Sequence, residues 1–164
     1  MLTWMVGTDG EWVIAIVRIV LGVVFFAHGA QMALGWFGGA GLQTTLRVFR
    51  EQLHIPGPLA MLAVAAELLG GLGLIVGLLS RIAALGIAVV MIVALVAVHR
   101  KFGFFMNWYG EKLGHGIEYH VLVLALALTV MIKGAGAFCL DQFLYQHESA
   151  QNRAALEAGN GRGK

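Results

Sequence analysis

The chain has 164 residues, of which 59% are hydrophobic and 12% charged, and its mean hydropathy is +0.82. This apolar share is far above that of ordinary soluble domains and indicates a membrane protein that lies in the lipid bilayer. The net charge of +2 comes from scattered charges with no basic stripe, which argues against nucleic acid as a partner, and a lone cysteine, Cys139, excludes an internal disulfide.

Four apolar segments predict four membrane helices. The first, 12–34, is long enough at about 1.5 Å per residue to cross a hydrocarbon core of about 30 Å. Segments 58–79 and 82–98 follow with a very short turn between them, so these two helices must pack antiparallel. The fourth segment, 114–132, is close to the lower length limit. We therefore expect an all-α membrane protein built as a four-transmembrane-helix antiparallel bundle.

An amphipathic segment, 42–54, lies between the first and second spans. Leu42, Leu46, Phe49 and Leu53 follow one another at steps of four, three and four, which places them on one face of a helix. Polar residues occupy most of the remaining positions. Such a helix is expected to lie along the membrane interface rather than to cross the bilayer.

The apolar part of the sequence is predicted to form a single domain. Residues 1–146 hold the four spans and the interfacial helix, and residues 147–164 form a polar tail that we expect to be disordered. Four spans place both termini on the same side of the membrane. Lys and Arg are equally frequent on the two sides, so the positive-inside rule leaves the orientation undecided.

Antiparallel threading of the four spans brings several polar residues to one face of the membrane. His28 and Gln31 lie near the end of the first span, His99 ends the third, and Glu118 begins the fourth. We take these four as a candidate polar cluster. His120 is two residues from Glu118, hence about 200° away around a helix, and we expect it to point away from this cluster.

Two charges are expected deeper in the bilayer. Arg18 lies ten residues before His28, and Glu67 lies nine residues after Pro58, which gives both a similar depth. A lone charge near the bilayer centre costs about 2.5 to 3.5 kcal/mol on insertion scales, so we expect Arg18 and Glu67 to form a buried ion pair. A purely structural role and a proton or ligand role are both open for this pair.

Six short motifs follow one another along the apolar part of the chain. They are Arg18-x-x-Leu21-Gly22-x-x-Phe25-x-x-His28-Gly29, Glu67-x-x-Gly70-Gly71, Gly77-x-x-x-Arg81, His99 with a Phe-rich loop, Gly116-x-Glu118, and Gly134-x-Gly136-x-x-Cys139-x-Asp141. This ordered set resembles the DoxX family of small bacterial and archaeal membrane proteins. Cys139 departs from the family pattern, which more often has Ser, and the exchange keeps a small side chain.

The resemblance implies a four-helix fold in the cytoplasmic membrane. Some members of the family are subunits of thiosulfate:quinone oxidoreductase, or of membrane complexes that respond to oxidative and thiol stress. Our leading hypothesis is therefore a membrane subunit of a quinone-linked oxidoreductase system for thiols or sulfur compounds. A quinone is the implied cofactor, and a soluble or membrane redox protein is the implied partner; whether this chain itself is catalytic stays open.

Two further hypotheses belong to other functional classes. In the first, the chain is a non-catalytic scaffold or anchor that binds a soluble redox enzyme through the 42–54 helix and the aromatic loop. In the second, His28 with His99 or His120 binds a haem or a metal between helices. The second is the weaker hypothesis, because the histidines form no compact ligand motif and we predict no metal site. The sequence leaves homo-oligomer formation open.

Overall fold

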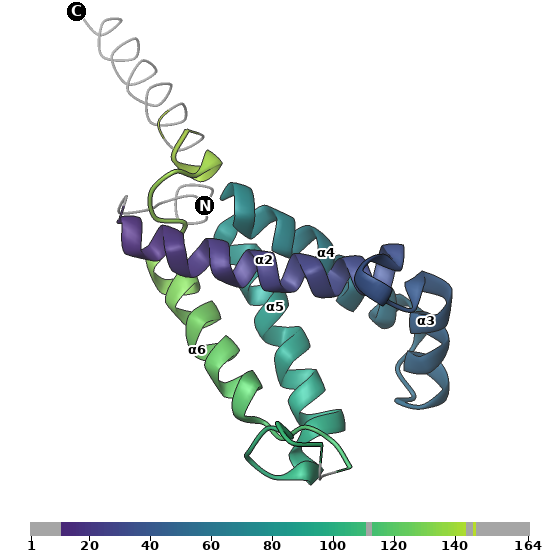
Figure 1. The fold of residues 1–164 in the computed structure, drawn as a ribbon. Coiled ribbons are helices and arrows are strands. Elements are labelled where there is room, and N and C mark those ends of the chain that lie inside the picture. The colour runs from purple at the N-terminus through teal and green to yellow at the C-terminus, as the bar shows by residue number, and fades with distance from the viewer. Residues whose placement is uncertain (1–10, 111–112, 144–145, 147–164) are drawn as a thin grey trace, which may run out of the picture.

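The structure is a computed structural model that describes residues 11–110, 113–143 and 146. All regular elements within these ranges are helical, which confirms the predicted all-α class (Figure 1). Helix α5 continues through a π-helical turn and a short 3-10 turn. The elements are α2 (Trp12–Leu34), η1 (Trp36–Gly38), α3 (Gly41–Glu51), α4 (Gly57–Val76), α5 (Ser80–Ala94), η2 (Leu95–His99), η3 (Arg100–Phe102) and α6 (Glu118–Lys133).

The four long helices form two antiparallel pairs. Helices α2 and α4 lie side by side, and α5 and α6 form a second pair that crosses the first at a steep angle (Figure 1). Glycines allow the close approach of α2 and α4: a Cβ on Gly22 would lie 2.8 Å from the carbonyl oxygen of Gly71, and one on Gly29 would meet the backbone of Leu68. The expected antiparallel packing holds within each pair, but the two pairs do not share one axis.

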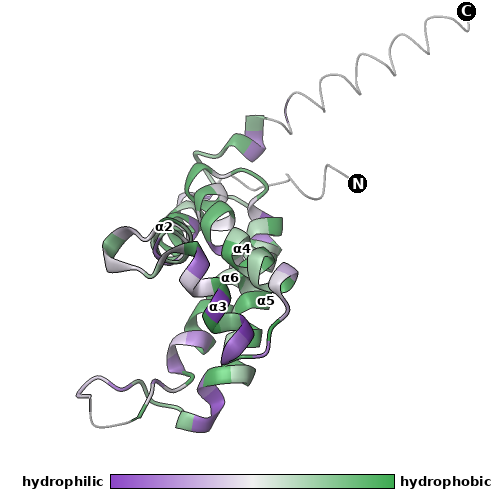
Figure 2. Cartoon of the chain, turned by 90° about the vertical axis from the view of Figure 1, so that its right-hand side faces the viewer, coloured by the Kyte–Doolittle hydropathy of each residue, from purple (hydrophilic) through white to green (hydrophobic). Residues whose placement is uncertain are grey.

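Three helices are long and apolar enough to cross a membrane. They are α2, α4 and the continuous helical stretch Ser80–Phe102. Their outward faces carry large apolar side chains, as expected for contact with lipid tails, and hydrophobic residues dominate all the long helices (Figure 2). Helix α6 has 16 residues, which corresponds to about 24 Å and is short for a full span. The chain is thus a multi-pass membrane protein.

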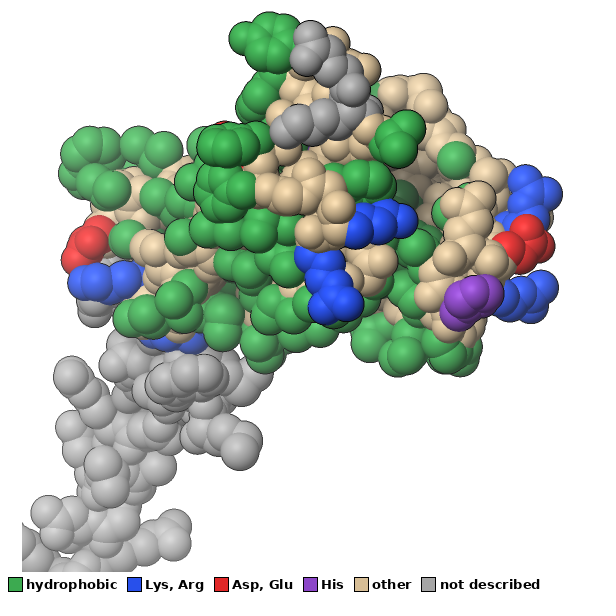
Figure 3. All heavy atoms as spheres, turned by 90° about the horizontal axis from the view of Figure 1, so that it is seen from below, with side chains coloured by type: hydrophobic (Ala, Val, Ile, Leu, Met, Phe, Trp, Pro, Cys, Tyr) green, Lys and Arg blue, Asp and Glu red, His purple; other side chains and the backbone are tan. Residues whose placement is uncertain are grey.

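Helix α3 occupies the position expected for the interfacial helix. It spans Gly41–Glu51, three residues shorter at its end than the predicted 42–54. The hydroxyl of Thr45 is buried and donates to the carbonyl of Met32 at 3.2 Å, which docks α3 on the end of α2. Charged side chains gather where α3 lies, at the right of the molecule in Figure 3. Its polar face is therefore open and its apolar face is partly covered by α2 and α4.

The hydrophobic core joins both helix pairs. Small and branched residues of α5 and α6 pack against Leu21 and Phe25 of α2 and Leu74 of α4, all at most 2% exposed. The other buried members are Ala84, Ile87, Met91, Val123, Ala127 and Val130. This core lies where the two pairs cross, so the far ends of the pairs diverge from it. The predicted tail, 147–164, lies outside the described residues.

Candidate functional site

Arg18 is completely buried, and its guanidinium group is the centre of a network of backbone carbonyls. Its Nε donates to Ala135 at 2.8 Å, and its two terminal nitrogens donate to carbonyls at the end of α4 and in the segment after α6. These acceptors are Leu74, Ile75 (2.9 Å), Ala137 (3.3 Å) and Phe138 (3.1 Å). Carbonyls at a helix end lack intrahelical partners, so Arg18 satisfies groups that would otherwise be unpaired in an apolar environment.

The predicted ion pair between Arg18 and Glu67 is wrong. Antiparallel packing places Glu67 level with Gly29, eleven residues or about 16 Å along α2 from Arg18. The prediction assumed that His28 and Pro58 lie at one level, but α4 begins beyond the end of α2. Within the described residues Glu67 forms neither a hydrogen bond nor an ion pair, and all the hydrogen bonds of the Arg18 side chain are to backbone carbonyls.

Asp141 organises the same end of the molecule. Its carboxylate is 1% exposed and accepts hydrogen bonds from the backbone N–H groups of Leu79 at 2.6 Å and Ser80 at 2.9 Å. Its own N–H donates to the carbonyl of Gly77 at 2.9 Å. A residue far along the chain thus caps the beginning of α5, where the first N–H groups of a helix need acceptors.

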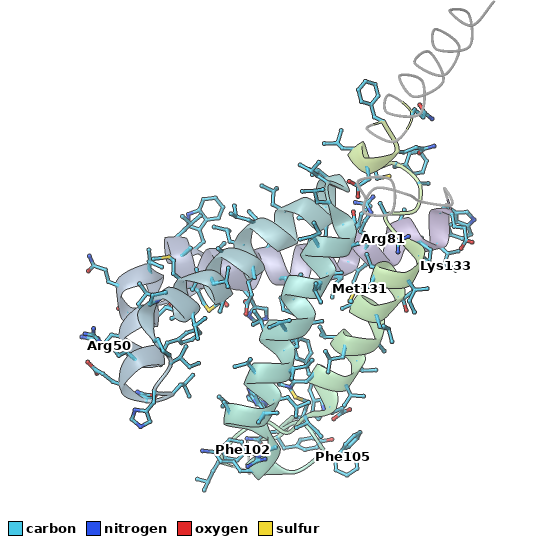
Figure 4. All side chains as sticks on the ribbon, turned by 180° about the vertical axis from the view of Figure 1, so that it is seen from behind. Arg50, Arg81, Phe102, Phe105, Met131 and Lys133 are labelled. Carbon is cyan, nitrogen blue, oxygen red and sulfur yellow. The ribbon has the colours of Figure 1, made fainter. Side chains whose placement is uncertain are left out.

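A second arginine ties α5 to the end of α6. Arg81 donates to the carbonyls of Met131 and Ile132, the latter at 2.7 Å, and Figure 4 shows it directed toward the end of α6. Lys133 forms an ion pair with Glu11 at 3.4 Å. The arginines and Asp141 that carry the family resemblance at this end therefore build a structural junction. We name it the terminal junction: Arg18, Gly77, Arg81, the 134–139 segment and Asp141.

Cys139 belongs to the terminal junction and is half-buried. Its thiol donates to the carbonyl of Gly136 at 3.1 Å, and its Cβ lies so close to Gly77 that a side chain at position 77 would collide with it. Burial raises the pKa of the Cys139 thiol, because it removes the water that stabilises a thiolate. The side chain therefore packs as a small neutral group.

The candidate polar cluster is divided between two places. His28 is exposed near the end of α2, and Gln31 in the next turn donates to the carbonyl of Phe37 at 3.4 Å. His99 and Glu118 lie at the far end of the α5–α6 pair, near the loop that carries Phe102 and Phe105 in Figure 4. The prediction assumed an antiparallel bundle whose four helices share one axis; because the two pairs cross, their ends diverge.

The roles of Glu118 and His120 are the reverse of those expected. The Glu118 carboxylate accepts from the backbone N–H of Met106 at 3.0 Å, and so fixes the loop before α6. His120 is 4% exposed, and its ring lies against that of His99 with the centroids 4.3 Å apart. The angular separation of the two residues was predicted correctly, but the loop folds back over the face that was expected to be the site.

Among the described residues, Ser80 Oγ, the Tyr119 hydroxyl and Nδ1 of His120 are buried without a hydrogen-bond partner, and the last two belong to neighbouring residues of α6. Glu67 of α4 is 8% exposed. Glu67 interacts electrostatically with Tyr119, and the Tyr119 and His120 rings meet edge to face at 5.7 Å. His99 completes this arrangement. We name Glu67, His99, Tyr119 and His120 the interior polar cluster.

The sequence indicated two members of this cluster and missed the others. Glu67 and His99 were singled out, His120 was assigned to the wrong face, and Tyr119 was not considered. The available signal was the adjacent pair of polar aromatic residues, Tyr119 and His120, at the beginning of an apolar helix. Two neighbouring residues on a helix point about 100° apart, and polar aromatic side chains at this place in an apolar helix are candidates for the protein interior.

The geometry does not support the haem or metal hypothesis. His99 and His120 lie against each other with their ring centroids 4.3 Å apart, and Nδ1 of His99 is hydrogen-bonded to the carbonyl of His115. His28 belongs to the other helix pair. Among the described residues no three side chains of His, Cys, Asp or Glu are grouped to hold a metal ion.

Fold and site together define an all-helical, multi-pass membrane protein with a structural junction at one end and a buried polar cluster between α4, α5 and α6. The DoxX family model matches residues 13–100, and the chain belongs to the DoxX family. It is also similar to a protein of Bacillus subtilis (strain 168) named "Putative oxidoreductase CatD", with 27% identity over 140 residues, 85% of this chain and 92% of that protein. No solved structure matches the chain.

Proposed function

We propose that this protein is the membrane subunit of a quinone-linked oxidoreductase system and that the quinone head group binds at the interior polar cluster. The observation that carries the proposal is the pair of buried polar atoms without partners, the Tyr119 hydroxyl and Nδ1 of His120. Buried polar atoms are hydrogen-bonded in the great majority of structures, so two of them side by side in an apolar interior are suited to a ligand.

The chemistry of these groups fits a quinone. A quinone head group has two carbonyl oxygens that accept hydrogen bonds and an apolar ring. The Tyr119 hydroxyl can donate to one carbonyl, and His120 can donate from Nδ1 in the tautomer that carries the proton there. His99 stacks on His120 and donates from its own Nδ1 to the carbonyl of His115 at 2.9 Å, which limits rotation of both rings. A bound quinone would supply two-electron, two-proton redox chemistry.

Two further observations support a redox role. The family resemblance implies a link to thiosulfate:quinone oxidoreductase, of which some members are subunits, and the similar Bacillus subtilis protein is named "Putative oxidoreductase CatD". Thiols or small sulfur compounds are therefore the electron donors that we propose. The cell inner membrane, where such quinones are dissolved, is the proposed location.

Quinone content tests the proposal directly. The protein is purified in mild detergent, and the quinone per protein is measured after solvent extraction. Loss of one hydrogen bond of about 0.5 to 1.5 kcal/mol predicts a two- to tenfold weaker affinity for Tyr119→Phe and for His120→Phe. His28→Ala is the matched control, since His28 is exposed at the end of the other pair. Equal occupancy in wild type and both cluster variants would refute the proposal.

The scaffold hypothesis is the second candidate, and the open polar face of α3 favours it. Gln43, Arg47 and Arg50 are exposed on this helix, while Thr45 anchors the opposite side. Changing both arginines to Gln should then release a co-purifying redox partner and leave the quinone content as in wild type. Retention of the partner by this variant would argue against the hypothesis.

A further inference from the structure

Glu67 is an acidic side chain inside the membrane domain, and the described part of the chain provides no cation paired with it. It is 8% exposed, and its backbone lies close to Gly29 of α2, where a side chain would collide with the backbone of Glu67 and Leu68. Where α5 packs on α4, it contributes Ala83 and Gly86, neither of them titratable. Among the described residues, Tyr119 of α6 is the titratable group with which Glu67 interacts electrostatically.

A row of proton-carrying side chains leads from Glu67 to the loop between α5 and α6. Tyr119 comes first, its ring meets His120 at 5.7 Å, and His120 stacks on His99 at 4.3 Å. His99 is partly exposed and donates to the carbonyl of His115, an exposed loop residue. The row therefore connects the interior of the membrane domain with the loop surface.

We propose that Glu67 is a proton-exchange site and that Tyr119, His120 and His99 carry protons between it and the exposed surface at His115. Each of these groups can accept one proton on one side and release one on the other, since a hydroxyl and an imidazole both donate and accept. The ring centroids of neighbours in the row lie 5.7 and 4.3 Å apart, so rotation of a side chain is the motion that brings their polar atoms together. A protonated Glu67 is neutral, and this avoids the cost of an unpaired charge in an apolar interior.

Proton exchange at Glu67 does not depend on the proposed function, but the delivery of these protons to a quinone rests on it. Reduction of a quinone at Tyr119 and His120 consumes two protons, and Glu67 is the group placed to supply one of them from inside. The test below is carried out on protein from which quinone has been extracted. A negative result in the infrared test would therefore not contradict quinone binding, and a negative result in the quinone measurement would not contradict proton exchange at Glu67.

Infrared spectroscopy of the full-length protein in lipid tests the proposal. At neutral pH the wild type should show a carboxylic-acid C=O band that disappears in Glu67→Gln and moves in Glu67→Asp, which keeps a carboxyl group. Glu118→Gln is the control and should keep the band, because Glu118 accepts from a backbone N–H in the loop. A band that persists in Glu67→Gln, or that is missing from the wild type, would overturn the proposal.

The route is tested by the rate at which that band shifts after transfer to D₂O. His120→Phe should slow the shift at least tenfold, and His28→Phe should leave the rate as in wild type because His28 lies outside the row. Circular dichroism of each variant verifies that the helices are retained. If the shift is as fast in His120→Phe as in wild type, protons reach Glu67 by another path and the proposed row is wrong.

Discussion

The terminal junction makes a quantitative prediction through Asp141. This carboxylate accepts two backbone hydrogen bonds, from Leu79 at 2.6 Å and from Ser80 at 2.9 Å, and it is 1% exposed. Asp141→Ala removes both acceptors and leaves two buried N–H groups at the beginning of α5 unpaired.

Hydrogen bonds to charged groups contribute about 1.5 to 3 kcal/mol each, so two of them give about 3 to 6 kcal/mol. Partial access of water to the opened site reduces the loss, and the cost of removing a helix cap, about 1 to 2 kcal/mol, sets a lower bound. We therefore expect Asp141→Ala to lower the free energy of unfolding by about 2 to 5 kcal/mol. Asp141→Asn keeps only one acceptor oxygen and should lie between Asp141→Ala and wild type.

Unfolding by SDS titration in mixed micelles, followed by circular dichroism, measures these differences. Gln142→Ala is the matched control, because Gln142 is the next residue and its side chain is exposed; it should unfold as the wild type does. If Asp141→Ala lowers the free energy of unfolding by less than about 1 kcal/mol, which is below the cost expected for removing a helix cap, then α5 does not depend on this cap. The assignment of the junction as the main structural constraint would then be refuted.

Two other predictions concern the same junction. Gly77→Ala should destabilise the protein by about 2 to 4 kcal/mol in the same titration, because Gly77 has a φ of +71° and a Cβ there would collide with Cys139. Gly57→Ala is the control, since a Cβ at Gly57 would meet open space. Equal stability of the two variants would contradict the reasoning. The raised pKa of Cys139 means that its thiol stays protonated at neutral pH, so alkylation by a thiol reagent should be slow at pH 7 and accelerate at a higher pH than for an ordinary cysteine. Asp141→Ala should speed this alkylation by opening the junction, and rapid alkylation of the wild type at pH 7 would show that Cys139 is not held as described.

The sequence by itself determined the class of this protein and the position of most of its helices. Long apolar segments cross lipid because a helix satisfies its own backbone hydrogen bonds, and this depends on local composition alone. Helix α2 has the predicted bounds, 12–34, and α4 is Gly57–Val76 against the predicted 58–79. The amphipathic spacing identified α3 for a similar reason, since the helical period is a local property.

The tertiary structure alone decided what the polar residues do. The depth of a residue on one helix relative to another depends on the register of packing, and the offset of α4 from α2 separates Arg18 from Glu67. Which of Glu118 and His120 faces inward depended on a loop that folds back through backbone hydrogen bonds invisible in the sequence. Because the helix pairs cross, His28 and His99 lie at different ends of the molecule, and the interior polar cluster forms from residues of three helices. Contacts between distant segments set these outcomes, and hydropathy along one chain carries no information about crossing angle or register.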